Sequence, residues 1–328
     1  MGRRPPSKRS SCSTRSCRPV NLDDDRLRVP TRALRIVSLL PSATEIVCAL
    51  GLEQQLVGVT HECDYPPSVG GKSVLTSSVL DGRLKSKDVD RHIRALVHRG
   101  SSIYELDAGR LDALRPDLVL TQELCRVCAV SYPIVEQAVR RIDGTPQLVS
   151  LEPESLDDVW RTIETVGGLT GTLDRAQALI ASLRHRLDVV RAAVAGRPQR
   201  RVVCLEWIDP PFSCGHWTPE LVSLAGGHEL LGAGGRPAAP VSLEAVADVH
   251  PEVVVIMACG FGLHRSLEEV DRLNGAFDHL APELWVVDGN AYFSRPGPRL
   301  VDSVEILAGI LHPEAIAAPP AGSASPLR

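Results

Sequence analysis

The stretch Arg35–Pro67, RIVSLLPSATEIVCALGLEQQLVGVTHECDYPP, contains the pattern that decides how this chain is expected to fold. Its apolar run Arg35–Leu40 predicts a strand, and the sequence SATE at Ser42–Glu45 predicts a capping box at the start of a short helix. Leu56–Thr60 predicts a second strand, which ends in the polar loop His61–Pro67. A β-α-β unit of this kind is typical of an open α/β sheet, in which ligands bind at the carboxyl ends of the strands.

The composition is that of a globular protein of ordinary polarity. At 328 residues and 35.4 kDa the chain is long enough for two lobes, each with its own hydrophobic core. A net charge of −4 and a pI near 6.2 argue against a nucleic-acid partner. No apolar stretch approaches the ~20 residues that a membrane span needs.

The cysteines and the N-terminal residues together predict a cytoplasmic location. Nine cysteines, an odd number at no regular spacing, favour reduced thiols over a disulfide framework. The first 19 residues carry six Lys or Arg and show no apolar core of the kind that a secretory signal needs.

The order of predicted strands and helices sets the domain boundaries. They are a basic leader expected to be disordered (1–33), an N-terminal α/β lobe (34–154), a connecting helical segment (155–198), a C-terminal α/β lobe (199–313) and a tail expected to be disordered (314–328).

The connecting segment contains the clearest helix of the chain. Over Leu173–Val194 the apolar residues recur at steps of three and four, which predicts an amphipathic helix ~33 Å long. The helix before it is expected to be capped by Ser155–Asp158 and to break at Gly167 and Gly168.

The two halves of the chain share a weak repeat. Leu111–Gln122 and Leu243–Met257 both run from a helix through a proline and an acidic residue into an apolar strand and a polar loop. This repeat predicts a duplicated lobe with the ligand bound between the two copies.

Five separated motifs resemble the helical-backbone (class III) substrate-binding proteins of ABC importers, and more narrowly their cobalamin-binding members. The motifs are IVSLLPSATEIVCALG, VGVTHECDYPP, RPDLVLTQ, the WIDPPF loop and the YFSRPGPR loop, in the family's order from Arg35 to about Pro313. The resemblance implies two Rossmann-like lobes joined by one long α-helix, with a metal chelate in the cleft between the lobes. It implies a binding protein for cobalamin, another corrinoid or a related metal chelate, and no enzymatic activity.

The resemblance also implies how a partner would dock. Relatives place a Glu near the start of the pre-proline helix of each lobe, where it pairs with arginines of the permease. Glu244 matches this position in the second lobe, whereas Gly109 occupies it in the first lobe and Asp107 lies close by. Because the docking charge is incomplete, the sequence favours a carrier or sensor over an importer component.

Polar and aromatic side chains gather in the loops that follow the predicted strands. The cobalamin-binding relatives line the cleft with aromatic residues at the ends of these strands. In this chain carboxylates occupy or adjoin several of those positions. The aromatic residues that remain in the loops are expected to stack on a planar ligand. The candidate ligand-binding residues are His61, Glu62, Asp64, Tyr65, Gln122, Glu123, Glu206, Trp207, His216, Trp217, Cys259, Asp288, Tyr292, Phe293 and Arg295.

Some of these loops also carry groups that bind zinc or iron. Imidazole, thiolate and carboxylate are the ligands that such ions prefer. The candidate metal ligands are Cys63, Cys125, Cys128, His61, Glu123 and His216, whereas Cys48 and Cys204 fall inside a helix and a strand and are expected in the core. A metal- or thiol-dependent enzyme therefore stays open as the alternative to a receptor.

Overall fold

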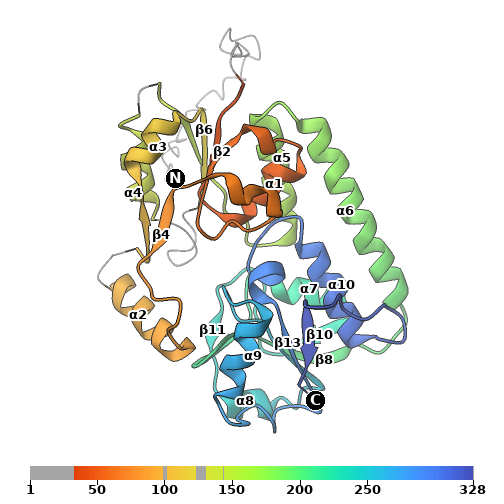
Figure 1. Ribbon diagram of the computed structural model, residues 1–328. Coiled ribbons are helices and arrows are strands. Elements are labelled where there is room, and N and C mark those ends of the chain that lie inside the picture. The colour runs from red at the N-terminus through yellow and green to blue at the C-terminus, as the bar shows by residue number, and fades with distance from the viewer. Residues whose placement is uncertain (1–32, 99–101, 123–130, 143, 328) are drawn as a thin grey trace, which may run out of the picture. The chain divides into compact units, whose positions relative to one another are not determined.

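The computed structural model describes residues 33–98, 102–122, 131–142 and 144–327. Residues Leu34–Arg328 form one compact unit, and the fold given below is that of its described residues (Figure 1). The leader, residues 1–33, lies almost wholly outside the described residues, as do Glu123, Cys125 and Cys128.

The N-terminal lobe is built on a parallel sheet, which in the described part of the chain has the strand order β3-β2-β1-β6-β7. Its strands are β1 Ile36–Ser38, β2 Leu56–Val59, β3 Ser73–Val74, β6 Leu118–Thr121 and β7 Gln147–Ser150. A separate antiparallel pair consists of β4 Thr76–Ser78 and β5 Tyr104–Leu106. The helices are α1 Pro41–Ala49, η1 Glu53–Gln55, η2 Pro67–Gly71, α2 Ser86–His98, α3 Ala108–Leu114 and α4 Tyr132–Val139. The central strand β1 is fully buried, as is typical of a strand inside a parallel sheet with both faces covered.

Helix α1 does not begin with the expected capping box. It starts at Pro41, which suits the first helical position, and its N-cap residue Leu40 makes no side-chain hydrogen bond. Ser42 is therefore already inside the helix, and the carboxylate of Glu45 is used elsewhere, by two arginines of the C-terminal lobe.

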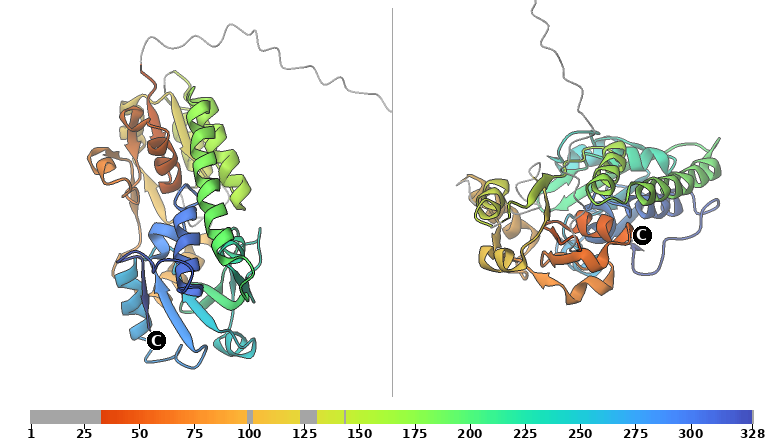
Figure 2. Two further views of the ribbon diagram at one scale, coloured as in Figure 1. Left: turned by 90° about the vertical axis from the view of Figure 1, so that its right-hand side faces the viewer. Right: turned by 90° about the horizontal axis from the view of Figure 1, so that it is seen from above.

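The connecting segment consists of α5 Leu156–Leu169 and α6 Leu173–Val194, which lie side by side (Figure 2). The capping box at Ser155 and Asp158 is present as expected. The predicted break at Gly167 and Gly168 comes one residue before the observed end of α5 at Leu169. A Cβ on Gly167 would lie 2.6 Å from the Ala176 Cβ, so this glycine allows α5 to pack closely on α6.

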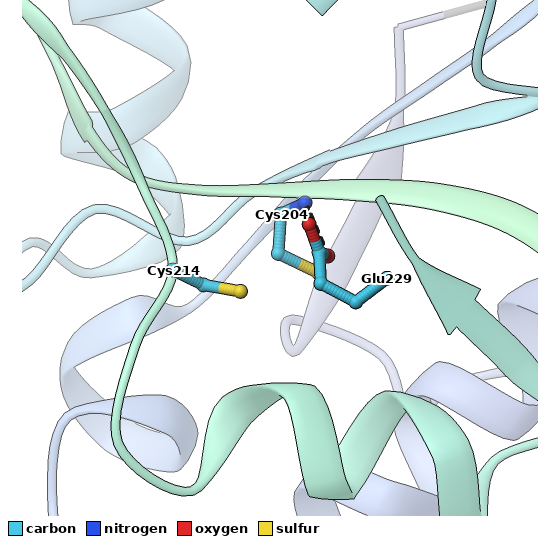
Figure 3. A group of neighbouring side chains, drawn as sticks. All are labelled: Cys204, Cys214 and Glu229. Carbon is cyan, nitrogen blue, oxygen red and sulfur yellow. Dashed lines mark hydrogen bonds between the residues drawn. The ribbon is translucent and has the colours of Figure 1, made fainter. Parts of the chain in front are cut away.

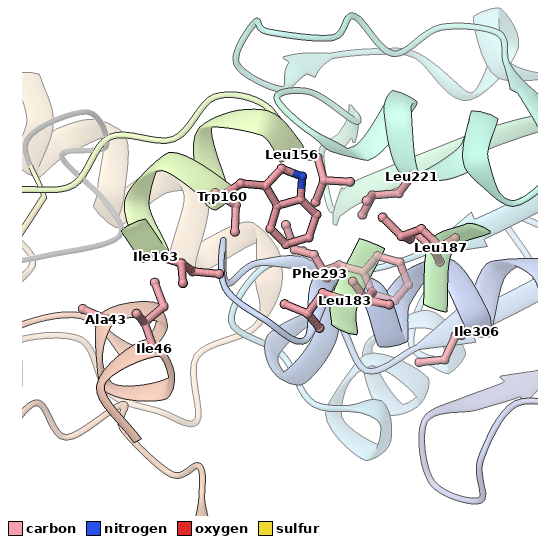
Figure 4. Close-up of a cluster of buried hydrophobic side chains, with 14 of the residues drawn as sticks. Ala43, Ile46, Leu156, Trp160, Ile163, Leu183, Leu187, Leu221, Phe293 and Ile306 are labelled. Carbon is pink, nitrogen blue, oxygen red and sulfur yellow. The ribbon is translucent and has the colours of Figure 1, made fainter. Parts of the chain in front are cut away.

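Helix α6 has the bounds that the periodicity predicts. Its buried face is formed by Ala176, Ile180, Leu183, Leu187, Val190 and Val194. This face packs on α5 and on α10 (Leu300–Leu311) of the C-terminal lobe. Figure 4 shows Leu183 and Leu187 in the main hydrophobic core beside Leu156, Trp160 and Phe293. The predicted first seam residue, Leu173, is instead 43% exposed.

The C-terminal lobe is built on a second sheet with the order β11-β9-β8-β12-β13-β14, and β10 also pairs with β8. Its strands are β8 Arg200–Ile208, β9 Pro211–Ser213, β10 Gly227–Glu229, β11 Ala239–Pro240, β12 Val253–Ile256, β13 Glu283–Val287 and β14 Ala324–Pro326. Its helices are α7 Thr218–Leu224, α8 Leu243–Asp248, α9 Leu263–Asp271, the π-helical turn η3 Gly289–Phe293 and α10 Leu300–Leu311.

The C-terminal residues correct a second expectation. The tail 314–328 was expected to be disordered, but strand β14 pairs antiparallel with β13 at the edge of the sheet. The Pro, Ala and Ser residues of this tail give no strand pattern in the sequence, because β14 is held by backbone hydrogen bonds, which do not require apolar side chains. Within the described ranges, no helix combines the length and apolar character needed to cross a membrane.

Helix α2 reaches from the N-terminal lobe to the C-terminal one. The backbone N–H of its first residue, Ser86, donates to the buried carboxylate of Glu269 on α9 at 2.8 Å. Arg265 donates to the carbonyl of Leu84 at 3.0 Å, and the Arg94 guanidinium lies 5.9 Å from the ring centre of Phe212. A helix that is N-terminal in sequence is therefore seated on C-terminal elements.

Candidate functional site

The loops at the carboxyl ends of the parallel strands bring together residues of both lobes. Asp64 and Tyr65 follow β2, while Arg295 and Arg299 follow β13 and η3. Two of these four residues are directly bonded across the lobes, because Arg295 Nη1 donates to Asp64 Oδ1 at 2.5 Å.

Arg295 is buried, with 4% of its surface exposed, and the described hydrogen-bond partners of its guanidinium belong to the N-terminal lobe. It donates to both carboxylate oxygens of Asp64, to Glu45 Oε1 at 3.4 Å and to the carbonyl of Glu62 at 3.2 Å. Burial acts to raise the pKa of Asp64, but the hydrogen bond and charge of Arg295 outweigh it and lower that pKa. Arg295, predicted as a ligand contact, is thus engaged by protein carboxylates.

Arg299 completes this ion network. Its Nε donates to Glu45 Oε2 at 2.9 Å and its Nη2 to Glu45 Oε1 at 2.6 Å. The same guanidinium lies 4.0 Å from the ring centre of Tyr65 and 5.6 Å from that of Tyr292. Two arginines are therefore matched by two carboxylates, Glu45 and Asp64, and the network carries no net charge when all four groups are ionised.

His61 and Glu62 form a second group in the loop after β2. The Nδ1 of His61 lies 2.7 Å from Thr76 Oγ1, its Nε2 lies 3.3 Å from Glu62 Oε1, and its ring centre is 5.3 Å from that of Tyr104. Partial burial, followed by the charge of Glu62, raises the pKa of the Tyr104 phenol. Tyr104 was missed by the sequence reasoning because a three-residue edge strand gives too short a pattern to place it.

Glu206 supplies a carboxyl group from the carboxyl end of β8. Its Oε1 accepts from the backbone N–H of Gly215 and from the Thr218 hydroxyl, both at 3.0 Å. Burial raises the pKa of Glu206 to about 7, despite these two hydrogen bonds. At neutral pH this group is consequently close to the midpoint of its titration. Cys259, the next candidate along the sheet, follows β12 with an exposed side chain.

The aromatic candidates divide between exposed and packed positions. Tyr65 is 44% exposed, and Tyr292 is partly exposed. Phe293 is 3% exposed and belongs to the main core, so its placement among the ligand contacts is corrected. Trp217 donates its indole N–H to the Phe293 carbonyl at 2.9 Å.

Trp207 and His216 also have protein neighbours on several sides. The Trp207 ring centre is 4.9 Å from that of Phe261, over which the Arg265 guanidinium lies at 3.7 Å. The His216 ring stacks on Trp217 at 5.6 Å, and burial lowers the pKa of His216. The Trp207 indole N–H and the His216 Nδ1 are buried without a hydrogen-bond partner in the described structure.

Two further candidates directly follow strands β13 and β6. Asp288 is the N-cap of η3 and accepts from the Ala291 N–H at 2.7 Å. Gln122 is buried at the end of β6.

The described metal candidates are not brought together. Cys63 is buried, and its Sγ lies 3.1 Å from the hydroxyls of both Thr44 and Thr60. Burial raises the pKa of this thiol, which opposes the thiolate form that metals bind. In the described ranges the group of three possible ligands that does converge is Cys204, Cys214 and Glu229, which sequence reasoning did not assemble.

The docking candidates occupy matching places in the two lobes. Glu244 is the second residue of α8, after the N-cap Ser242, and Gly109 is the second residue of α3, after the N-cap Asp107. Both Glu244 and Asp107 are exposed.

A family model described as "Periplasmic binding protein" matches residues 36–275. The vitamin B12-binding protein of Vibrio cholerae is 24% identical to this chain, with 85% of this chain and 89% of that protein covered. An uncharacterized ABC transporter substrate-binding lipoprotein of Bacillus subtilis, YvrC, is 26% identical, with 90% and 86% covered.

Solved structures have the same fold. A periplasmic heme binding protein from Pseudomonas aeruginosa gives a TM-score of 0.64 at 22% identity, covering 90% of this chain and 95% of that one. The periplasmic vitamin B12 binding protein BtuF of Vibrio cholerae gives 0.58 at 22% identity, covering 84% and 96%.

These similarities overturn one expectation from the sequence. The predicted cytoplasmic location is wrong, because the matching family and these relatives are periplasmic proteins or, in Bacillus, a lipoprotein. The odd number and irregular spacing of the cysteines are therefore no evidence for a reducing compartment, since disulfide bonds form and persist in oxidising extracytoplasmic compartments.

Proposed function

This chain belongs to the periplasmic binding protein family, and from this premise we propose that it is an extracytoplasmic receptor that captures a corrinoid, cobalamin above all, and presents it to an ABC permease. The choice of a corrinoid over haem rests on one observation: Glu45 and Asp64 already engage both arginines of the inter-lobe network.

The electrostatics of the proposed site favour a ligand without carboxylates at its rim. Haem carries propionates, which need guanidinium or ammonium partners to be bound well. Arg295 and Arg299 are neutralised, while Glu62 is 39% exposed and Glu206 is partly buried. A corrinoid carries amides at its rim, and their N–H groups donate to such carboxylates without charge repulsion.

The exposed rings provide the stacking surface for this ligand. Tyr65 is held by the Arg299 guanidinium on one face, and the ring retains 44% exposure. A flat, apolar macrocycle gains free energy by covering such a ring. Tyr65 is therefore the aromatic contact that the proposal depends on most.

The proposed partner is a permease whose arginines pair with one acidic residue in each lobe. Glu244 supplies this charge at the start of α8, and we assign the same role in the first lobe to Asp107, the exposed N-cap of α3. The Bacillus relative is named as an ABC transporter substrate-binding lipoprotein, which favours an importer component over the free carrier or sensor expected from Gly109.

The family favours this receptor over the metal- or thiol-dependent enzyme considered as the alternative, because periplasmic binding proteins carry a ligand. A bound zinc or iron ion held by the loop residues stays a prediction. Elemental analysis of the purified protein would test it.

The experiment that tests the ligand class is equilibrium dialysis against hydroxocobalamin and against haemin, followed by absorbance. We expect hydroxocobalamin to be retained more strongly than haemin. Glu62→Arg should shift the preference toward haemin, since it adds a cation for a propionate. The matched control Glu164→Arg, an exposed position on α5, should leave the preference unchanged. Equal or stronger retention of haemin by the wild-type protein would refute the assignment.

A further inference from the structure

Cys204 and Cys214 lie directly opposite each other in the C-terminal sheet. Cys204 is on β8, and Cys214 immediately follows β9, in a register that pairs Leu205 with Ser213. The backbone N–H of Cys214 donates to the carbonyl of Cys204 at 3.0 Å. Residues that face each other in this way in antiparallel strands have Cα atoms about 4.5–5.5 Å apart, within the range that a disulfide bond spans.

Figure 3 shows the Cys214 sulfur directed toward Cys204, whose own sulfur lies beside Glu229. The two Sγ atoms and a Glu229 carboxylate oxygen all lie within 4.8 Å of one another. Cys204 is 0% exposed and Cys214 is 1% exposed, so both thiols lie in the interior of the lobe.

The Glu229 carboxylate is held by backbone N–H groups and also accepts a hydrogen bond from the Cys204 thiol. Its Oε2 accepts from the N–H of Cys204 at 2.9 Å, and its Oε1 accepts from the N–H groups of Leu231 and Gly232 at 3.1 and 3.0 Å. Cys204, Cys214 and Glu229 are three possible ligands, one fewer than the four that a structural zinc ion takes. The geometry favours a bond between the sulfurs over a shared metal ion.

We propose that Cys204 and Cys214 are joined by a disulfide bond in the protein as it works outside the cytoplasm. An oxidised thiol–disulfide oxidoreductase is the class of oxidant required. One cysteine thiolate attacks a sulfur of the oxidant's disulfide, and the second displaces that sulfur as the Cys204–Cys214 bond forms. Two electrons and the two thiol protons pass to the oxidant, which becomes a dithiol.

The surroundings determine when this bond forms. Burial raises the pKa of the Cys204 thiol to about 11, and the hydrogen bond that the Cys214 thiol donates to Cys204, together with burial, raises the pKa of Cys214. The reactive thiolates are therefore scarce once the lobe is folded. The bond is expected to form during folding and to resist reduction afterwards.

The bond would fix the segment after β9, whose residues donate hydrogen bonds to the Glu206 carboxyl group on β8. Gly215, next to Cys214, and Thr218 both donate to Glu206. A Cβ on Gly232 would lie 2.3 Å from Cys214 Sγ, so the loop after β10 closes over the same sulfur. Joining Cys214 to the rigid strand β8 would hold these contacts in place.

The test is differential thiol labelling of the full-length protein exported to an oxidising compartment. The denatured protein is alkylated without reduction, then reduced and labelled with a second reagent. Cleavage after Trp207 and Phe212 separates the two cysteines. We expect both to carry only the second label, and the two peptides to stay linked until reduction.

Exposure of the native protein to dithiothreitol should leave the bond intact, whereas dithiothreitol in denaturant should break it. The buried thiol of Cys63 is the internal control and should take the first label. First-reagent labelling of both Cys204 and Cys214, or one zinc ion per chain that is lost on alkylation, would overturn the proposal.

Discussion

Arg295 and Glu45 are 250 residues apart in the sequence, and the Nη1 of Arg295 donates to the Glu45 carboxylate at 3.4 Å in the interior of the protein. This contact joins the loop after β13 to α1, and Arg299 strengthens it through two shorter hydrogen bonds to the same carboxylate. The two lobes are thus linked by buried ions in addition to α6.

Replacing Glu45 should destabilise the protein strongly. Glu45→Gln keeps the shape of the side chain but leaves Arg299 without its ionic partner. Removing one member of a buried pair costs about 3–5 kcal/mol in the free energy of unfolding, as measured by urea denaturation. The control Glu164→Gln, on the exposed face of α5, should change it by less than about 0.5 kcal/mol. Equal stability of the two variants would contradict the role given to this carboxylate.

The packing of α6 allows a matched pair of substitutions on one helix. Leu187 is 5% exposed and Val189 is 55% exposed. Leu187→Asp should lower the free energy of unfolding by at least about 3 kcal/mol, because it buries a carboxylate in an apolar seam. Val189→Asp should have little effect. Similar melting temperatures for the two variants would mean that α6 does not use this face in the core.

The raised pKa of Glu206 predicts that the free energy of unfolding depends on pH. Its pKa of about 7 in the folded protein is above the ordinary Glu value of 4.5, so the folded state holds its proton to higher pH than the unfolded state. The stabilising contribution of Glu206 to the free energy of unfolding is therefore fully present below pH ~4.5 and is lost as the pH rises through ~7.

Glu206→Gln removes this titration. Relative to the wild type, the variant should gain stability between pH 5 and pH 8, by up to about 3 kcal/mol for a shift of this size. Urea denaturation at both pH values measures the difference. A constant difference between wild type and variant across this range would show that the Glu206 pKa is unshifted.

Tyr65 is expected to contribute to corrinoid affinity through its ring. Tyr65→Ala should weaken hydroxocobalamin binding by about 1–3 kcal/mol, as is usual for a buried aromatic contact in an interface. Tyr65→Phe keeps the ring and should retain most of the affinity. If both variants bind as tightly as the wild type, the ligand does not cover this side chain.

Local patterns predicted the parts of the fold that depend on local sequence. The steps of three and four gave α6 its observed ends, Leu173 and Val194, because burial of one helix face leaves a periodic trace. The capping box at Ser42 failed because Glu45 takes its partners from the far end of the chain. No local pattern contains that information.

The difference between local sequence patterns and contacts that are distant in the sequence also explains which parts of the candidate site could be predicted. The strand ends were predicted well enough to place Asp64 and Arg295 in loops that meet. That Phe293 is in the core depends on the π-helical turn η3, which turns the side chain inward. The pairing of Cys204 with Cys214 depends on the register between β8 and β9, which the single sequence did not reveal.

The most direct test of the receptor assignment is calorimetric titration of the metal-stripped protein with hydroxocobalamin, with elemental analysis of the untreated sample. The account predicts saturable binding of one corrinoid per chain and no stoichiometric metal in the protein without corrinoid. An absence of corrinoid binding, together with one zinc or iron ion per chain, would contradict it and favour a metal site on the receptor fold.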